Sequence, residues 1–229
     1  MKQKAAKELF TILDIETTGL DPNGCQIIEL AAIQTDLEKE FGRLNMRAAL
    51  NEGQELSEFI VNLTGITEDD LFGAYPEQFV AIMFGLFSKG TTVVVQNAPF
   101  DLSFLDKFGV RPDFFLCTRA MMKLAEPTES ASLKHVVERL GIKYEGHHQA
   151  MSDVSMTIEI LKKAFEKLES KGIRRFEYQN TVIDMPDRPL SFIPKGAFVQ
   201  SVDKEGNFTE RKKASDIEVE EALANEQAN

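Results

Sequence analysis

The sequence predicts an α/β fold with a mixed, roughly five-stranded sheet flanked by helices, plus a small C-terminal extension. Residues 10–50 carry three strand-like runs, and a short turn between the second and third gives hairpin spacing. Residues 77–172 then alternate between helical and strand-like periodicity. A chain of 229 residues, 43% of them hydrophobic, is long enough to bury one substantial core.

The first strand begins at Phe10, because the run FTILDI is apolar or β-branched at every position except Asp14. The segments 26–36 and 41–50 have the composition of the second and third strands. A helix follows at 77–90, with its apolar residues spaced to share one helical face and Gly90 as its stop. The residues on that face are Phe79, Ile82, Met83, Leu86 and Phe87.

The remaining elements of the predicted domain alternate in type up to Gly172. TTVVVQ is the clearest strand of the chain and DFFLCT is a short, buried one. Three helices carry apolar residues at helical spacing. These elements are the strands 91–96 and 113–118 and the helices 97–109, 130–141 and 152–172.

Two parts follow from these patterns: a domain over residues 1–172 and a separable C-terminal extension over residues 173–229. Beyond Gly172 the helical periodicity disappears and prolines become frequent. A hairpin is expected to turn near Gly206 and Asn207, and the acidic, aromatic-free end is expected to be a loose helix or mobile.

Composition restricts the compartment and the partners. The chain has two cysteines, no apolar run of the roughly 20 residues that a membrane span needs, and a charged start, so the cytoplasm is the expected location. The formal net charge of −11 does not suit a protein that binds a long stretch of double-stranded nucleic acid, because such binding needs a surplus of cations. Nucleic acid would be held over a small footprint, with metal ions supplying the local positive charge.

Four acidic residues stand where the predicted elements change. Asp14 and Glu16 are two positions apart on a strand, so their side chains point to the same face. Asp101 follows the strand 91–96, and Asp153 begins the last long helix. Together in one pocket, four carboxylates repel one another unless divalent cations with oxygen ligands compensate. Such a site suits two-metal phosphoryl transfer.

Three segments at these positions resemble the motifs of one enzyme family. LDIETTGL, QNAPFD and HQAMSD are similar, in order, to the three motifs of the DnaQ-like 3′–5′ exonucleases, and the histidine five residues before Asp153 resembles their DEDDh branch. This family includes the proofreading epsilon subunit of bacterial DNA polymerase III. The segments IIELAAI, LTGIT and SLKHVVERLGI match as well, so the resemblance covers roughly residues 8–170.

The resemblance implies an RNase H-like fold and two Mg²⁺ or Mn²⁺ ions held by Asp14, Glu16, Asp101 and Asp153. It assigns His148 as the general base on the attacking water, which suits an imidazole that titrates near neutrality. His147 is one residue too far from Asp153 for that role. The resemblance also implies that substrate contacts come from four further positions, namely Thr17, Thr64, Asn97 and Phe100.

The chain departs from the family pattern at three positions outside this set of ligands and base. Gln96 stands where a histidine is frequent, Thr64 replaces the histidine of a His-Gly-Ile turn, and Gln149 stands where a basic residue is frequent.

Taken singly, each acidic residue also has an explanation that needs no function. Asp14 and Glu16 could face solvent on an edge strand, and Asp101 could be a carboxylate favoured by a helix dipole.

The predicted function is removal of nucleoside 5′-monophosphates from single-stranded or frayed 3′ ends of DNA, in proofreading or repair, with a DNA polymerase subunit as a further partner. One alternative is an RNA 3′-trimming exonuclease of the same branch. Another is a non-catalytic subunit that binds a polymerase. No membrane partner is expected.

Overall fold

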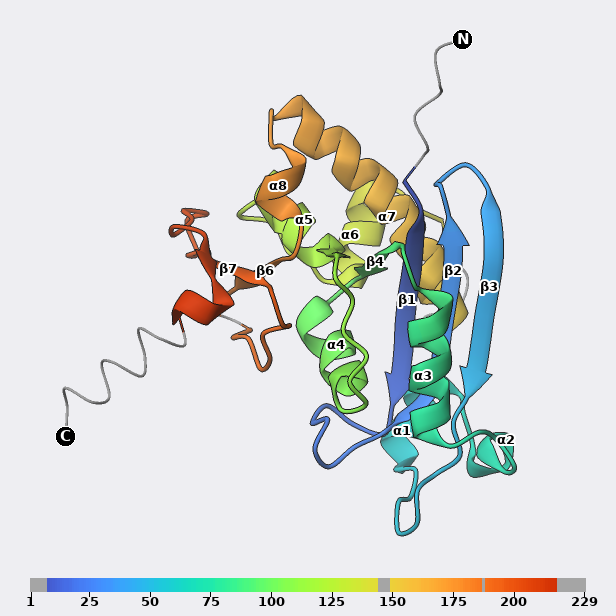
Figure 1. Cartoon of the computed structure of the whole chain (residues 1–229). Coiled ribbons are helices and arrows are strands. Elements are labelled where there is room, and N and C mark those ends of the chain that lie inside the picture. Colours follow the sequence, from blue (N-terminus) through green and yellow to red (C-terminus); the bar gives the residue numbers. More distant parts are fainter. Residues whose placement is uncertain (1–7, 144–148, 187, 218–229) are drawn as a thin grey trace, which may run out of the picture.

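The computed structural model describes residues 8–143, 149–186 and 188–217 (Figure 1). The histidines at 147 and 148 and most of the acidic end therefore lie outside the described residues. Within the described residues, no helix combines the length and the apolar character needed to cross a bilayer.

A five-stranded mixed sheet in the order β3-β2-β1-β4-β5 forms the centre of the molecule, as predicted (Figure 1). The pairs β1–β2 and β2–β3 are antiparallel, and the pairs β1–β4 and β4–β5 are parallel. The strands are β1 (Phe10–Thr17), β2 (Ile27–Thr35), β3 (Glu40–Arg47), β4 (Thr92–Val95) and β5 (Phe115–Cys117).

Helices cover both faces of the sheet. Leu13 and Ile15 of β1 pack in a buried cluster with α3 and α4, whereas Ile12 packs with α5, α6 and α7. This division follows from the alternation of side chains along a strand. The helices are α3 (Glu77–Phe87), α4 (Ala98–Asp106), α5 (Thr118–Ala125), α6 (Leu133–Leu140) and α7 (Ala150–Ser170).

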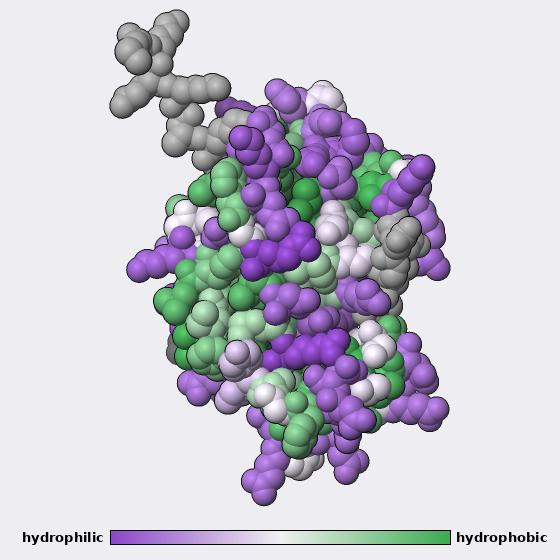
Figure 2. Space-filling model, turned by 90° about the vertical axis from the view of Figure 1, so that its right-hand side faces the viewer, coloured by the Kyte–Doolittle hydropathy of each residue, from purple (hydrophilic) through white to green (hydrophobic). Residues whose placement is uncertain are grey.

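The apolar face that the spacing indicates for α3 is not the face that packs on the sheet. Val80, Ala81 and Phe84 are fully buried, whereas Phe79 and Ile82 are 42% exposed. Figure 2 shows hydrophobic side chains in green among hydrophilic ones in purple on one face of the molecule. Because α3 is apolar almost all round, periodicity alone does not determine which side faces the core.

Four short helices have no counterpart in the sequence prediction. α1 (Glu58–Thr64) and α2 (Glu68–Leu71) are set by local side-chain caps, from Ser57 and Thr67 respectively. Each is too short to give a periodic signal. The other two are α5 and α8 (Arg175–Tyr178).

The C-terminal extension forms a second, three-stranded sheet in the order β6-β7-β8. The predicted hairpin is present: β7 and β8 are antiparallel, and the N–H of Asp203 donates to the carbonyl of Asn207 across the turn. β6, which pairs in parallel with β7, was not predicted. The strands are β6 (Thr181–Asp184), β7 (Phe198–Ser201) and β8 (Lys212–Lys213).

The extension shares its apolar core with the preceding domain. Val182, Ile183 and Val202 belong to the same buried cluster as Leu102 of α4 and Phe115 of β5. This packing argues against a freely separable extension, while the boundary at Gly172 itself stays a prediction.

Candidate active site

Asp14 and Glu16 lie on β1 and face the side of the sheet that α7 covers. Side chains two positions apart on a strand share a face, and Ile12, two residues before Asp14, packs in the same cluster as α7. The structure thus gives both carboxylates one shared direction, and Glu16 is only 8% exposed.

Asp153, in the first turn of α7, meets them there. Carboxylate oxygens of Asp14, Glu16 and Asp153 all lie within 4.8 Å of one another. Asp153 Oδ1 is buried and has no hydrogen-bond donor among the described residues. An unpaired buried carboxylate oxygen is costly, so this atom is suited to a bound cation.

Asp101 reaches the cluster from α4, which begins directly after β4. Pro99 occupies the first turn of that helix, a position that proline favours. Asp101 is 4% exposed, and its charge raises the pKa values of both Asp14 and Glu16. Asp101 therefore lies near Asp14 and Glu16, two of the three residues whose carboxylate oxygens converge within 4.8 Å.

Burial, together with repulsion between neighbours, raises the pKa values of these carboxyl groups. The pKa of Glu16 rises to about 8, with repulsion from Asp153 as the second cause. Burial raises the pKa of Asp101 and that of Asp153 to about 7 each, although the N–H groups of Asn97 and Asp101 lower the value for Asp101. Burial and then repulsion from Asp101 raise the pKa of Asp14 well above its ordinary value.

The cluster fits a hard divalent cation. Without a cation, these raised pKa values keep part of the cluster protonated near neutral pH. An all-oxygen set of carboxylates is the donor set that Mg²⁺ and Mn²⁺ prefer. A cation would displace the retained protons and supply the missing partner of Asp153 Oδ1.

Glu29 is a fifth carboxylate of the site and was not singled out from the sequence. It stands on β2 directly opposite Glu16 and is 8% exposed. Its Oε2 accepts a hydrogen bond from the N–H of Ala150, at the start of α7, at 3.4 Å. Its Oε1 lies 3.7 Å from Arg47 Nε. The sequence does show one charged residue inside the apolar run IIELAAI. Its place in the site can be recognised only when the pairing of β1 and β2 is known.

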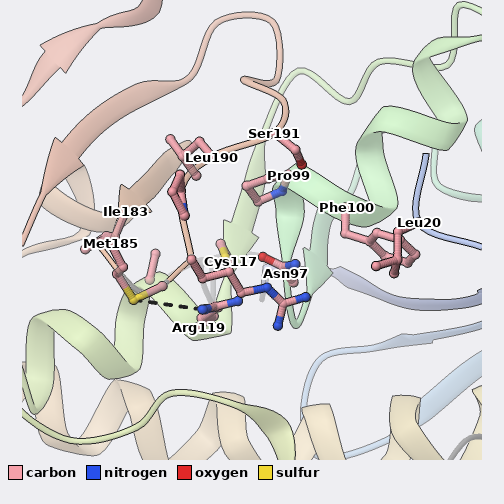
Figure 3. Close-up of a pocket in the computed structure, with 13 residues that line it drawn as sticks. Leu20, Asn97, Pro99, Phe100, Cys117, Arg119, Ile183, Met185, Leu190 and Ser191 are labelled. Carbon is pink, nitrogen blue, oxygen red and sulfur yellow. Dashed lines mark hydrogen bonds between the residues drawn. The ribbon is translucent and has the colours of Figure 1, made fainter. Parts of the chain in front are cut away.

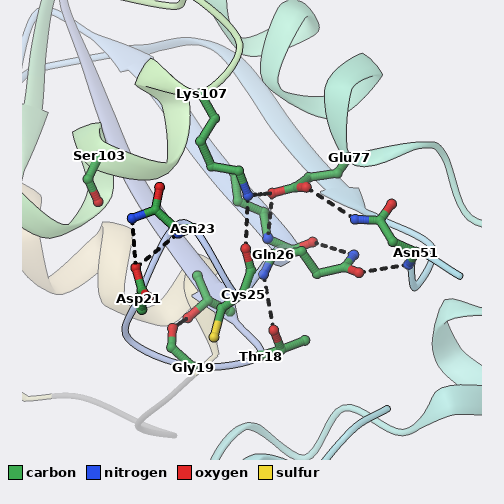
Figure 4. Close-up of polar contacts among 12 residues, drawn as sticks. Thr18, Gly19, Asp21, Asn23, Cys25, Gln26, Asn51, Glu77, Ser103 and Lys107 are labelled. Carbon is green, nitrogen blue, oxygen red and sulfur yellow. Dashed lines mark hydrogen bonds and ion pairs between the residues drawn. The ribbon is translucent and has the colours of Figure 1, made fainter. Parts of the chain in front are cut away.

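The loop between β1 and β2 is fixed beside the cluster by a buried polar network (Figure 4). Glu77 Oε1 accepts hydrogen bonds from the N–H of Ile27 at 2.9 Å and from Lys107 Nζ at 3.2 Å. Lys107 Nζ also donates to the carbonyl of Cys25 at 2.8 Å. Gln26 closes the loop, with its N–H donating to Thr18 Oγ1 at 3.0 Å. Glu77 of α3 and Lys107, directly after α4, thereby hold the loop in place.

The four predicted substrate contacts divide into two pairs. Thr17 and Thr64 are buried, and their hydroxyls donate to the carbonyls of Gly19 (2.6 Å) and Ile60 (2.9 Å), so both stabilise local backbone. Asn97 and Phe100 instead line a cavity of about 240 Å³, together with Arg119 and Met185 (Figure 3).

Gln96, one of the departures from the family pattern, has a structural role. Its Nε2 donates to the carbonyl of Ala131 at 3.0 Å, and its Oε1 accepts a hydrogen bond from Thr118 Oγ1. These contacts tie the end of β4 to α5 and to the segment before α6. The predicted base, His148, and its neighbour His147 lie outside the described residues.

Comparison with known proteins supports an exonuclease domain. The family model RNase_T, described as "Exonuclease", matches residues 11–161. The chain is 32% identical over 180 residues to the DNA polymerase III PolC-type of Caldanaerobacter subterraneus subsp. tengcongensis, with 76% of this chain and 13% of the relative covered. It is 30% identical over 189 residues to the PolC-type polymerase of Thermotoga maritima, with 78% and 13% covered. The chain therefore spans about an eighth of the length of these relatives.

Solved structures confirm the predicted RNase H-like exonuclease fold. The nuclease domain of 3'hExo, a DEDDh family member bound to rAMP, matches with a TM-score of 0.62 at 19% identity, covering 77% of this chain and 97% of that one. E. coli exonuclease I in complex with a dT13 oligonucleotide matches with a TM-score of 0.64 at 19% identity, covering 72% and 42%.

Proposed function

Because the chain belongs to the RNase_T exonuclease family, we propose that it is a metal-dependent 3′–5′ exonuclease that releases nucleoside 5′-monophosphates from DNA 3′ ends in proofreading or repair. One observation carries this proposal. Asp14, Glu16 and Asp153 converge within 4.8 Å, and Asp101 lies near enough to raise the pKa values of two of them.

In this mechanism Asp14, Glu16, Asp101 and Asp153 would hold two Mg²⁺ or Mn²⁺ ions, which when bound would supply a lowered pKa for the attacking water and positive charge against the phosphate. His148 takes the proton from that water, since a neutral imidazole is an effective base near pH 7. The 3′ oxygen of the shortened strand leaves, and the phosphate stays on the released nucleotide.

The substrate is proposed to be a single-stranded or frayed 3′ end. A net charge of −11 leaves few cations to neutralise phosphates, so binding is expected to be weak and to involve the last few nucleotides. The relatives are DNA polymerases and one neighbour binds a dT13 oligonucleotide, which supports DNA. Association with a DNA polymerase subunit and a cytoplasmic location belong to the same proposal.

RNA 3′-trimming is the second candidate, because another neighbour, 3'hExo, is bound to rAMP. The 2′-hydroxyl is the feature by which a protein distinguishes the two substrates at a given site. A non-catalytic scaffold is less well supported, because all four predicted acidic ligands are present. Their mutual repulsion destabilises the metal-free fold, and a scaffold would have no need of them.

Digestion of matched 3′-labelled DNA and RNA oligonucleotides, single- and double-stranded, tests the proposal. With Mg²⁺ or Mn²⁺ the single-stranded DNA should be shortened fastest, and Asp14→Asn or a chelator should stop the reaction. Faster digestion of RNA would move the assignment to RNA trimming. Absence of metal-dependent cleavage by the wild-type chain would favour the scaffold.

A further inference from the structure

The outward side of α3 carries a row of large apolar side chains. Phe79, Ile82 and Leu86 follow one another at helical spacing, so they share one side of the helix. All three are exposed, and the exposed fraction of Leu86 is 63%. Tyr75, just before α3, extends the row, because its ring stacks on that of Phe79 with the ring centroids 5.0 Å apart. We call these four residues the α3 stripe.

The α3 stripe departs from the ordinary pattern of a surface helix. Such a helix buries one apolar face and turns polar or charged side chains to the solvent. The buried face of α3 already packs on the sheet, through Val80 and Phe84. Its opposite side is apolar as well, and Phe72, three residues before Tyr75, is 92% exposed. Exposed apolar surface of this extent indicates a binding surface.

Opposite charges stand at the two ends of the α3 stripe. Asp69 lies in α2, ahead of the start of α3, and Lys89 lies two residues beyond its end (Figure 1). Both side chains are exposed, and neither has a hydrogen bond or an ion pair with another described residue. A partner with the same two charges in the reverse order would complement both. A second copy of this chain has that order when it lies antiparallel.

We propose that the α3 stripe is the contact surface of a homodimer, in which two α3 helices pack antiparallel about a two-fold axis. A two-fold interface brings the same patch of both copies together, so every contact between two different residues occurs twice. Asp69 of each copy then faces Lys89 of the other. The axis passes near Phe79, which is midway between these two residues in the chain. Antiparallel helix dipoles add a further attraction.

The apolar area is sufficient for such an interface. The α3 stripe and Phe72 together present on the order of 500 Å² per copy, taking about 200 Å² for a fully exposed large side chain. Two copies would therefore bury about 1,000 Å² from these side chains alone, which is the lower limit for a specific interface. Nucleic acid fits the surface poorly, because the α3 stripe contains no cation to bind phosphate.

This pairing leaves both acidic clusters uncovered. α3 packs on the face of the sheet to which Leu13 and Ile15 point, whereas Asp14 and Glu16 point to the face that α7 covers. An interface on the outer side of α3 is therefore across the sheet from the acidic cluster. The dimer would carry two independent sites, so its dissociation should not change the activity per chain.

Sedimentation equilibrium over a concentration series tests the proposal on the full chain. The wild type should show a reversible equilibrium between monomer and dimer. Leu86→Glu puts a charge into the α3 stripe at an exposed position, and it should raise the dissociation constant about thirtyfold or more, as expected for loss of a main contact residue. Phe176→Glu is the matched control, because Phe176 is 57% exposed but lies on α8, outside the stripe. It should dimerise like the wild type.

A charge exchange tests the antiparallel arrangement separately. Asp69→Lys and Lys89→Glu should each raise the dissociation constant about three- to tenfold, because each places like charges together at both ends of the interface. The double variant Asp69→Lys/Lys89→Glu should recover most of the wild-type affinity. Far-UV circular dichroism of every variant shows whether the fold is kept, since all three substituted positions are exposed.

A wild type that stays monomeric at the highest concentration would overturn the proposal. So would a dimer that Leu86→Glu does not weaken while the fold is kept, because the contact would then lie elsewhere. Equal weakening by Leu86→Glu and Phe176→Glu would also count against the α3 stripe. A double variant with no recovery would refute the antiparallel pairing. None of these outcomes depends on nuclease activity, so the proposed function is tested independently.

Discussion

Glu29 lies directly opposite Glu16 across the antiparallel β1–β2 pair, and Arg47 of β3 continues the same row. Directly opposed residues on neighbouring strands point to one face. Glu29 has two effects on the site, one on the charge of Glu16 and one on the position of α7. It raises the pKa of Glu16, and it accepts a hydrogen bond from the first residue of α7, the helix that carries Asp153.

Glu29→Ala should lower kcat/KM by about 10–100-fold, the usual effect of removing a group that orients metal ligands. Glu29→Gln should lose less, because its amide oxygen can still accept from Ala150. In Glu29→Gln the pKa of Glu16 should fall from about 8 toward its ordinary value, because one negative charge is gone. Steady-state kinetics with a Mg²⁺ titration measures the first effect. Equal activities of the two variants would argue against a role for this hydrogen bond.

Asp14→Asn should abolish cleavage and yet stabilise the metal-free protein. Its carboxyl stands in a buried cluster where burial and four other site carboxylates disfavour the charged form. Removing that charge relieves the repulsion. Thermal unfolding in EDTA should give a higher Tm for the variant, and Mg²⁺ should raise the Tm of the wild type only. A lower Tm for the variant in EDTA would mean that repulsion is not the dominant cost.

The stabilising effect of metal should increase with pH. In the folded, metal-free state the pKa of Glu16 is about 8 against an ordinary 4.5, and the pKa of Asp153 is about 7 against 3.8. Groups with raised pKa contribute stability below their ordinary pKa and lose it as pH rises through the folded value. The metal-free protein should therefore lose this contribution between about pH 4 and 8.

Bound metal requires ionised ligands, so the rise in Tm on adding Mg²⁺ should grow from pH 5 toward pH 8. Buffered melting curves with and without Mg²⁺ give this difference directly. Other titrating groups contribute to both curves and cancel in the difference. A rise in Tm that is independent of pH would exclude linked proton release.

His148→Ala should lower turnover by about 10²–10⁴-fold, the usual contribution of a positioned general base. His147→Ala should cost far less, because its spacing to Asp153 does not match the motif. Pre-steady-state cleavage at saturating Mn²⁺ measures the chemical step in both variants. The opposite ranking would show that the base is one residue earlier in the chain.

Local sequence was enough to predict the residues that form the acidic cluster. The alternation of a strand aims Asp14 and Glu16 together, and the starts of two helices supply Asp101 and Asp153. Glu29 could not be predicted in the same way, because its role depends on the register between β1 and β2. The spacing of apolar residues likewise predicted the wrong buried face for α3, because this helix has apolar residues on both sides. The cavity lined by Asn97 and Met185 arises from contacts between residues far apart in the sequence.

The same long-range contacts make the extension part of the exonuclease core, and Asn180 shows why. Asn180 adopts a positive φ of 51°, which places its Oδ1 to accept from the N–H of Phe115 at 2.7 Å. Its Nδ2 donates to the carbonyl of Asp113 at 2.9 Å. β5 is a short strand, so these bonds complete the pairing at its outer edge.

Asn180→Ala should lower the free energy of unfolding by about 1–3 kcal/mol, because the N–H of Phe115 loses its acceptor. Asn207→Ala, the control, removes a hydrogen bond confined to an exposed turn and should change stability by less than about 0.5 kcal/mol.

Truncation after Gly172 should lower the free energy of unfolding more than Asn180→Ala does. It uncovers Leu102 and Phe115, which pack against Val182 and Ile183 in one buried cluster. Urea unfolding of the full chain, the two substitution variants and the truncated chain gives the ranking. A truncated chain as stable as the full one would restore the expectation of a separable extension.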